Sequence, residues 1–451
     1  MRVLAFAFAL WVCVPAAGFA QTGQASQARQ FLLEASALIK DIPEPQRESA
    51  VANLSGQLTR AGDLPDALAT IQLLEKPDQQ AFAMGSVAWE LADGGPSAQA
   101  LFLIQGTKES PGRDVSYEHL ALRLVQKGDF EQGLRVAHLI REPSRLVESL
   151  VRLGVLTEDP AATRRCLVEA LDVAEEALQK NPSYAGILNQ IAGAQAQIGA
   201  TPETTVALSR MSAIARKRRD ETGDTTLLQA LGATEARIGD TAEATQIAQE
   251  LSESSADWVY SSISQEQASL GLMTEALAAA SKISAPTLRD STLREIAMIR
   301  RSSGSSNDCF EAINQMSSPS AQAEAIATLA LEQASANNAA AYQTLQLWHA
   351  STGGGVWVGG KGRETAAVAY GLLGDFVSAA QILDSIREPE ARTWPLWNLT
   401  KLLVKSGHAQ EATELAFREE TALPKAYAFL GTAQGLLDLF ESQAGASPKN
   451  H

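Results

Sequence analysis

Apolar residues recur along this chain at helical spacing, in short stretches. After the Gly62-Asp63 step they stand at Ala67, Ile71 and Leu74, which places them on one face of a three-turn helix. The same spacing returns elsewhere: Ala379, Ile382, Leu383 and Ile386 in one stretch, and Leu293, Ile296, Ala297 and Ile299 in another. No stretch alternates apolar and polar residues with strand chemistry. We therefore expect an all-α fold with essentially no sheet.

Glycine and proline divide these helices into a unit of about 33 residues. In five segments a proline follows a glycine by fifteen positions: Gly62/Pro77, Gly128/Pro143, Gly271/Pro286, Gly304/Pro319 and Gly374/Pro389. Glycine takes the left-handed conformation after a helix, and a following aspartate can cap the next helix. Proline cannot continue a helix and opens a new one. Each unit is therefore predicted to be a two-helix hairpin that stacks on its neighbours.

The pattern resembles the tetratricopeptide family. In Gly374-Asp-Phe-Val-Ser-Ala379 and in Gly128-Asp-Phe-Glu-Gln-Gly133, the Gly-Asp-aromatic-x-x-small string matches the family's interhelix turn and close-packing position. The resemblance covers about residues 47–440 and implies a right-handed α-solenoid of about eleven two-helix repeats. The proline comes about two residues early and the first-helix aromatics are mostly missing, so no ligand-binding residue is carried over. Whether the array is open or closed is left undecided.

The first twenty residues are typical of a secretory signal peptide. Arg2 precedes an apolar run over residues 3–14, and small residues lead up to Ala20, after which we expect cleavage. The apolar run is short for a bilayer span; an uncleaved anchor and a lipid anchor at Cys13 are the alternatives. We expect a periplasmic or secreted protein with no integral membrane segment after cleavage.

The rest of the chain is expected to be one continuous array, because no Pro/Ser/Gly-rich linker divides it. We assign 21–30 to a flexible N-terminal segment, 31–440 to the solenoid and 441–451 to a disordered tail. Irregular insertions are expected near 165–183, 212–224 and 348–363.

Charge and cysteine content narrow the range of partners. Without Arg2 the chain keeps 36 Lys+Arg (37 less one) against 52 Asp+Glu, a formal charge of −16, which disfavours nucleic acid as a partner. Cys166 and Cys309 are about four units apart, too far for a disulfide, and we interpret them as buried apolar residues.

Motifs for chemistry are scarce. The five histidines fall in separate units, so no metal site is expected, and no Gly-x-Ser-x-Gly elbow is present. The stretch Gly355–Lys361 imitates a phosphate-binding loop, but Gly362 stands where Ser or Thr is needed. We expect no cofactor.

Aromatic residues gather around this glycine-rich stretch. Such residues beside an adaptable loop provide contact area at low entropic cost, and two basic residues could add a cationic rim. The candidate partner-binding residues are Trp348, Trp357, Lys361, Arg363, Trp394 and Trp397. Core packing is the competing interpretation for Trp348, Trp394 and Trp397.

Two functions compete. The first is an exported, non-enzymatic interaction scaffold that presents a concave helical surface to a protein, a peptide or a cell-envelope partner. The alternative is an accessory or catalytic component of envelope glycan metabolism, acting on peptidoglycan or polysaccharide. The sequence identifies neither the partner nor the oligomeric state.

Overall fold

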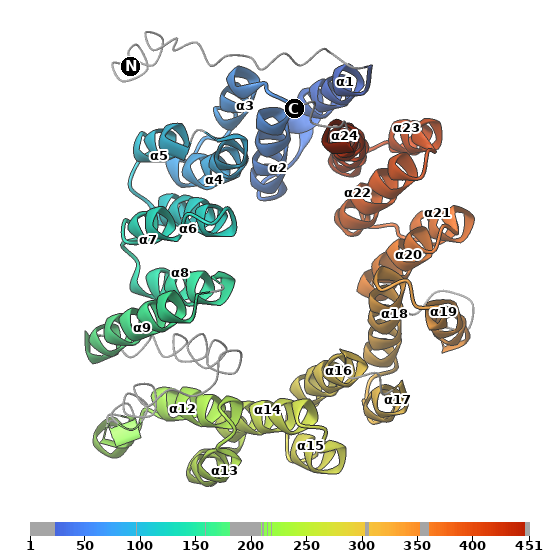
Figure 1. Cartoon of the computed structure of the whole chain (residues 1–451). Helices are drawn as coiled ribbons and strands as arrows, with labels where there is room; N and C mark the ends of the chain where they lie inside the picture. The colour runs from blue at the N-terminus through green and yellow to red at the C-terminus, as the bar shows by residue number, and fades with distance from the viewer. Residues whose placement is uncertain are drawn as a thin grey trace.

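The chain folds into paired helices arranged around a common axis (Figure 1). The computed structural model describes residues 23–95, 97–157, 159–180, 209, 212, 213, 215–217, 219–302, 306–351 and 360–446. Every regular element in these ranges is a helix, which confirms the predicted all-α solenoid of two-helix units. Within the same ranges no helix is long and apolar enough to cross a membrane. The number of repeats stays a prediction.

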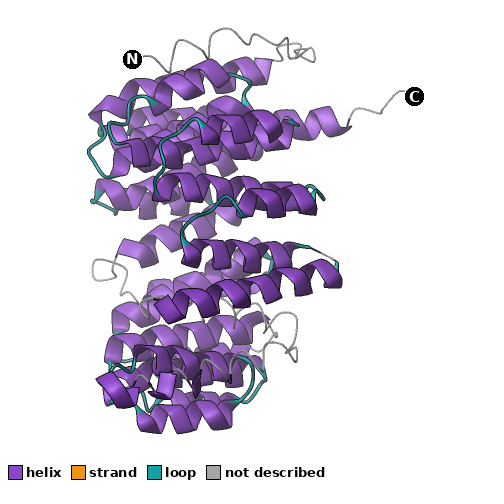
Figure 2. Ribbon diagram, turned by 90° about the vertical axis from the view of Figure 1, so that its left-hand side faces the viewer, coloured by secondary structure: helices purple, strands orange, loops and turns teal. Residues whose placement is uncertain are grey.

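The helices form two layers that run roughly parallel to one another (Figure 2). The inner layer consists mostly of long helices: α2 (Gln46–Arg60), α4 (Pro77–Gly94), α6 (Pro111–Gln126), α8 (Pro143–Leu156), α12 (Thr226–Arg237), α14 (Glu253–Ser269), α16 (Pro286–Ser302), α18 (Pro319–Ser335), α20 (Gly360–Leu372), α22 (Pro389–Lys405) and α24 (Ala422–Ala446). The outer layer consists of short ones: α3 (Leu64–Ile71), α5 (Ser97–Gln105), α7 (Phe130–Ala137), α13 (Thr241–Glu250), α15 (Met273–Ala280), α17 (Ser306–Asn314), α19 (Ala340–Ser351), α21 (Phe376–Asp384) and α23 (Ala409–Arg418). The remaining helices are α1 (Gly23–Leu38), the short 3₁₀ helix η1 (Ile39–Asp41) and α9 (Pro160–Lys180).

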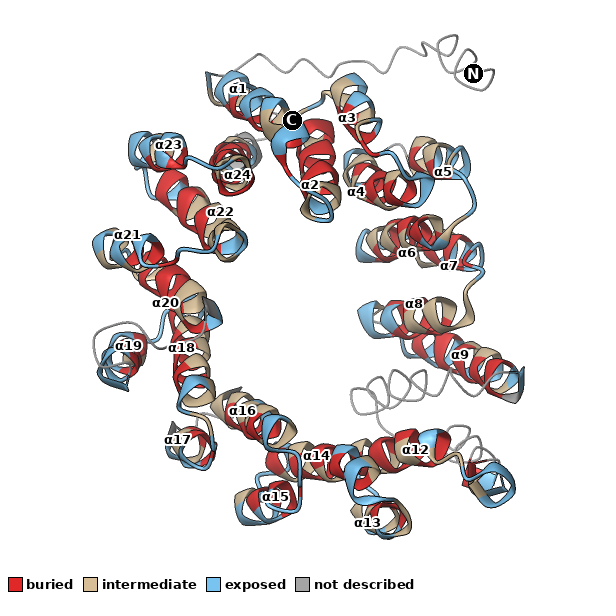
Figure 3. Cartoon of the chain, turned by 180° about the vertical axis from the view of Figure 1, so that it is seen from behind, coloured by how far each residue is buried: buried red, intermediate tan, exposed pale blue. Residues whose placement is uncertain are grey.

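The described helices carry a large apolar cluster and a smaller one at α12–α15. Buried residues run along the inner helices and the facing sides of the outer ones (Figure 3). One continuous apolar cluster includes Ala28 near the start of the described chain and Leu437 near its end. Cys166 and Cys309 lie in this cluster, fully buried and unbridged, which confirms the interpretation made from their spacing.

The turn residues act as the sequence predicts. Four of the five glycines in the Gly/Pro pairs have positive φ, from +79° at Gly374 to +87° at Gly128, and the fifth, Gly304, lies outside the described residues. The aspartate that follows caps the outer helix in four units: Asp63 accepts from Asp66 N, Asp129 from Gln132 N, Asp240 from Glu243 N and Asp375 from Ser378 N. A proline begins six inner helices: α4, α6, α8, α16, α18 and α22. Gly133 holds the predicted close-packing position, since a Cβ there would lie 2.6 Å from Val125 Cγ2.

Neighbouring inner helices are joined by a second aspartate that the sequence pattern did not reveal. The buried carboxylate of Asp290 on α16 accepts from the backbone N–H groups of Ser317 (2.8 Å) and Ser318 (3.0 Å), at the start of α18. Asp257 on α14 does the same for Ser284 and Ala285, at the start of α16. These bonds satisfy backbone donors that a helix cannot satisfy itself, so they hold the start of one inner helix against the inner helix before it.

The two ends of the array meet. Helix α24 packs against α1 and α2 as well as against α22 and α23. Phe429 stacks on Phe31 with ring centroids 5.9 Å apart, and Phe417 meets it edge-on at 5.2 Å. Arg60 on α2 forms ion pairs with Asp438 (2.9 Å) and Glu441 (2.5 Å) on α24. We call these contacts between α24 and α1–α2 the seam, and they close the solenoid on itself.

Two predicted boundaries are wrong. The segment 21–30 was expected to be flexible, but from Gly23 onward it is part of α1, where Ala28 is buried against the core. The tail was expected to begin at 441, but α24 continues to Ala446. At the N-terminal end, the seam supplies the apolar partner that keeps α1 folded. The predicted insertions fall on α9, on described residues between 212 and 224, on the end of α19 and the start of α20, and in part on residues outside the described ranges.

Candidate functional site

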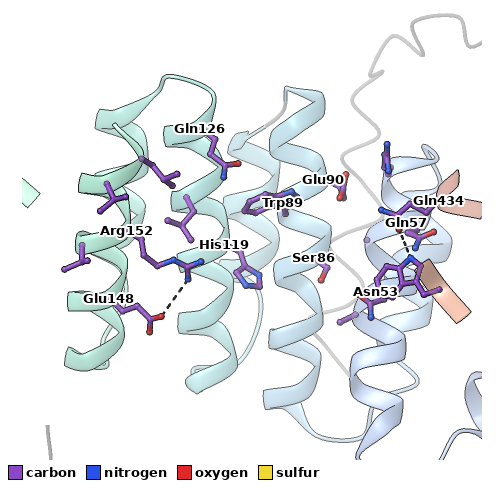
Figure 4. Close-up of a pocket in the computed structure, with 18 residues that line it drawn as sticks. Asn53, Gln57, Ser86, Trp89, Glu90, His119, Gln126, Glu148, Arg152 and Gln434 are labelled. Carbon is purple, nitrogen blue, oxygen red and sulfur yellow. Dashed lines mark hydrogen bonds and ion pairs between the residues drawn. The ribbon is translucent and has the colours of Figure 1, made fainter. Parts of the chain in front are cut away.

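A cavity of about 740 Å³ opens on the inner layer beside the seam. Its wall is built from α2, α4, α6 and α8, with Trp397 of α22 and Gln434 of α24 completing it from the other end of the chain (Figure 4). A volume of this size is typical of a small-molecule site. Because the wall draws on both ends of the array, the cavity depends on the seam.

Small residues allow the wall helices to approach closely. A Cβ at Gly56 would lie 3.3 Å from Ser86 Cβ, and one at Gly85 would lie 3.0 Å from the ring of His119. Farther along α6, a Cβ at Gly112 would lie 2.2 Å from the carbonyl oxygen of Asp78. Larger side chains would push α2, α4 and α6 apart, so these residues set the spacing of the wall.

At the seam end, Trp397 is held in one orientation. Its indole Nε1 donates a hydrogen bond to Gln434 Oε1 at 2.6 Å, and its ring meets Tyr427 edge-on at 5.8 Å. Burial raises the pKa of the Tyr427 hydroxyl, against the opposing effect of a hydrogen bond with Asn53. Trp397 therefore presents a fixed ring to the cavity.

The middle of the cavity carries a second indole, Trp89. The guanidinium of Arg123 lies 5.0 Å from its ring centroid, and His119 meets its edge at 6.4 Å. Burial lowers the pKa of His119, with Arg152 and Arg145 acting in the same direction and Glu118 opposing them. Burial thus favours the neutral form of the imidazole.

Glu90 is one of the two acidic residues that line the cavity, together with Glu148. Burial raises its pKa to about 6, with Asp93 adding to the shift and Arg60 and Arg123 opposing it. A buried carboxyl group of this kind takes up a proton under mildly acidic conditions.

At the far end, the cationic Arg152 is engaged by the protein itself. It forms an ion pair at 2.5 Å with Glu118, whose side chain is only 3% exposed, and lies 3.9 Å from Glu148. Arg145 binds the second oxygen of Glu118 at 2.7 Å. Arg152 is therefore held in place as part of the wall.

Gln57 is the polar residue of the cavity whose bonding is incomplete. The residue is 8% exposed, lines the cavity, and its Oε1 has no hydrogen-bond partner among the described residues. In Figure 4 it lies at the seam end near Gln434. A buried acceptor without a donor is costly, and such groups need an explanation.

The residues predicted from sequence do not come together in one site. Trp397 lines the cavity, and Trp394, one turn earlier on α22, is 41% exposed. Trp348 is 4% exposed on the outer helix α19, so it is a core residue with no surface for a partner.

The two basic candidates lie away from the cavity. Lys361 is exposed at the start of α20, beside residues of α16 and α18. Arg363 donates to the Ser385 carbonyl at 3.0 Å. Trp357 lies outside the described residues.

Sequence analysis missed Gln57, Trp89, Glu90 and His119. They are spread over α2, α4 and α6, only Trp89 and Glu90 are adjacent, and none belongs to a motif. They could have been found by looking for polar or aromatic residues on the inner face of the predicted long helices. That face packs against no outer helix, so such residues there are free to line a site.

The paired helices, the positive-φ glycines and the capping aspartates define the fold. It is a tetratricopeptide-like α-solenoid. No protein-family model and no curated protein matches the chain.

Solved structures give distant matches to this helical repeat. Ton1535 from Thermococcus onnurineus NA1 is 15% identical, with a TM-score of 0.29, over 85% of this chain and 97% of its own. Yeast Tom70 is 16% identical, with a TM-score of 0.29, over 94% and 97%. The Cut9-Hcn1 hetero-tetramer of the APC/C is 11% identical, with a TM-score of 0.23, over 91% and 94%. Likeness at these TM-scores carries no information on the partner of this chain.

Proposed function

We propose that this protein is an exported, non-enzymatic scaffold that holds a protein, peptide or cell-envelope partner on the inner face of its closed solenoid. The observation that carries the proposal is the 740 Å³ cavity on the inner layer, to which six helices from both ends of the chain contribute. Concave surfaces of stacked hairpins are the surfaces that helical-repeat proteins use for binding.

Two further properties of the inner face support binding. Trp89 and Trp397 are held by neighbouring side chains, so they offer apolar area without the entropic cost of ordering. The partly exposed Val155 and Leu156 at the end of α8 add an apolar rim. Rigid aromatic residues in a partly desolvated pocket are the type of residue that dominates binding energy.

Site-specific photo-crosslinking in the native host tests which face binds. A photoreactive amino acid replaces Val155, which lines the cavity, or Val377, which is 70% exposed on the outer helix α21. We expect partner crosslinks from position 155 and few from position 377. Equal crosslinking from both positions would contradict an inner binding face.

Export and the lack of catalysis are tested separately. The mature protein, purified from the exported fraction, should begin at Gln21; a chain that still begins at Met1 contradicts cleavage. Turnover of peptidoglycan or polysaccharide by the purified protein would contradict the non-enzymatic assignment.

A further inference from the structure

We propose that the cavity beside the seam is a binding site for an uncharged oligosaccharide of N-acetylated amino sugars. The inference rests on the part of the proposed function that makes the inner face the binding face. It adds the chemical class of one ligand.

The first observation is the incomplete hydrogen bonding of Gln57. Its Oε1 is buried in the cavity wall and has no donor among the described residues. Folding alone would favour an apolar residue at this position, because an unmet buried acceptor opposes stability. Because this oxygen has almost no accessible surface, the carboxamide must turn about its terminal torsion to present it to the cavity, where a ligand N–H or O–H group would supply the missing donor.

The second observation is the charge of the lining. Four charged residues line the cavity, and they cancel as two positive and two negative: Arg60, Arg152, Glu90 and Glu148. Both arginines are already held by carboxylates of the protein, Arg60 by Asp438 and Glu441 and Arg152 by Glu118. A carboxylate or phosphate ligand would have to displace these pairs, so the site favours an uncharged ligand.

The third observation is the combination of planar amides and indoles. Four carboxamides line the cavity, each with both donor and acceptor atoms: Asn53, Gln57, Gln126 and Gln434. Gln434 uses its oxygen for Trp397 Nε1 at 2.6 Å, which leaves its amide N–H groups as donors. Trp89 and Trp397 add flat apolar surface.

The functional groups of an N-acetylated sugar complement the carboxamides and indoles of the cavity. The C–H face of a pyranose ring stacks on an indole, and its hydroxyl groups bind planar amides. An acetamido group presents one N–H donor and one carbonyl acceptor, which complement a carboxamide. A peptide without aromatic or proline side chains offers the same amides but no flat apolar face, so the two indoles favour the sugar over such a peptide.

Calorimetry on the purified protein with chitotetraose, the tetramer of N-acetylglucosamine, tests the proposal. Cellotetraose, which lacks the acetamido groups, and tetra-alanine are the comparison ligands. We expect saturable binding of chitotetraose, accompanied by a change in tryptophan fluorescence. Binding of both comparison ligands should be at least tenfold weaker. No binding of chitotetraose at millimolar concentration, or equal binding of tetra-alanine, would overturn the proposal.

Gln57→Met separates a binding role from a structural one. Methionine keeps the length of the side chain and removes the unmet acceptor. We expect at least tenfold weaker binding of chitotetraose with a melting temperature that is unchanged or raised. Gln79→Met is the matched control, because Gln79 is also 8% exposed but lies outside the cavity wall; it should keep its affinity within twofold. Full affinity in Gln57→Met would overturn the proposal.

The two proposals fail differently. If position 155 still crosslinks partners while chitotetraose does not bind, the sugar site is wrong and the inner binding face stands. If neither the crosslinks nor sugar binding are found, both proposals fall.

Discussion

Two kinds of contact hold the helices of this protein together. Regular contacts join neighbouring units, and the seam joins the two ends of the chain. At α14–α16–α18, buried aspartates bind backbone N–H groups 27 or 28 residues further along the chain. At the seam, Phe31 meets Phe429 and Arg60 meets Glu441, 381 positions away. The first type of contact follows from repetition and recurs. The second occurs between the two chain ends, and it is the one that creates the cavity.

The two kinds of contact should therefore contribute differently to the stability of the array and to its shape. A regular contact joins units that are already neighbours in sequence, so its loss weakens the array without changing its path. A seam contact closes a long loop of chain, so its loss lets the ends separate. Four substitutions test this distinction, in order of decreasing effect.

Phe429→Ala is the largest expected change. The ring is 1% exposed and packs between Phe31 and Phe417, and truncation of such a residue costs about 3–5 kcal/mol. We expect a lower melting temperature and a larger radius of gyration by small-angle X-ray scattering. An unchanged radius would show that the seam holds without this ring.

Asp257→Ala breaks a regular contact. The substitution leaves the N–H groups of Ser284 and Ala285 without their acceptor, at a cost of about 3 kcal/mol at pH 7. We expect a lower melting temperature with an unchanged radius of gyration, and a smaller loss for Asp257→Asn, which keeps one acceptor oxygen.

The pH dependence of this contact has a defined sign. Burial opposes ionisation of Asp257, but the N–H groups of Ser284 and Ala285 and the Ser284 hydroxyl outweigh it and lower the pKa below its usual value. The stabilisation is therefore present above the ordinary pKa of an aspartate and is lost as the pH falls through the lowered pKa. The difference between wild type and Asp257→Ala should shrink under strongly acidic conditions.

Glu90→Gln probes the cavity behind the seam. The pKa of Glu90 is raised to about 6 in the folded state, from 4.5, so the folded state binds the proton more tightly than the unfolded state does. Ionisation of Glu90 therefore lowers the stability of the fold as the pH rises from 4.5 through 6. The substitution should raise stability by up to about 2 kcal/mol at pH 7.5 and change little at pH 4. In the Phe429→Ala background we expect the pKa of Glu90, followed by NMR, to move back toward 4.5. A destabilised Glu90→Gln variant at pH 7.5 would contradict the assigned burial.

Gly374→Ala is the smallest expected change. Its φ of +79° is a conformation that an L-residue adopts at a cost of about 1 kcal/mol. Chemical denaturation should show that loss, whereas Gly94→Ala, at a helical position with open space around its Cβ, should not be destabilising. Equal effects at both positions would contradict the turn assignment.

The sequence predicted the turns and caps within each unit far better than it predicted the seam or the aspartates that join neighbouring units. Gly62, Gly128 and Gly374 could be assigned to turns because glycine alone tolerates positive φ, and Asp63 and Asp375 could be assigned to caps because the cap is local. Contacts such as Arg60–Glu441 follow no sequence period, because in the sequence each partner is indistinguishable from other charged residues on a helix. For the same reason Trp397 was found through its clustering in sequence, whereas Gln57 and Trp89 were not.

A distance measurement across the seam tests closure directly. Spin labels are attached at Leu33→Cys on α1 and Ser442→Cys on α24, in a Cys13→Ser chain. Labelling is selective because Cys166 and Cys309 are buried, and burial raises the pKa of the Cys166 thiol to about 12. Residue 442 lies thirteen positions from Phe429, about 20 Å along the helix. A closed solenoid predicts one narrow distribution at about 20–30 Å. A broad distribution at much longer distances would show an open array and contradict the seam.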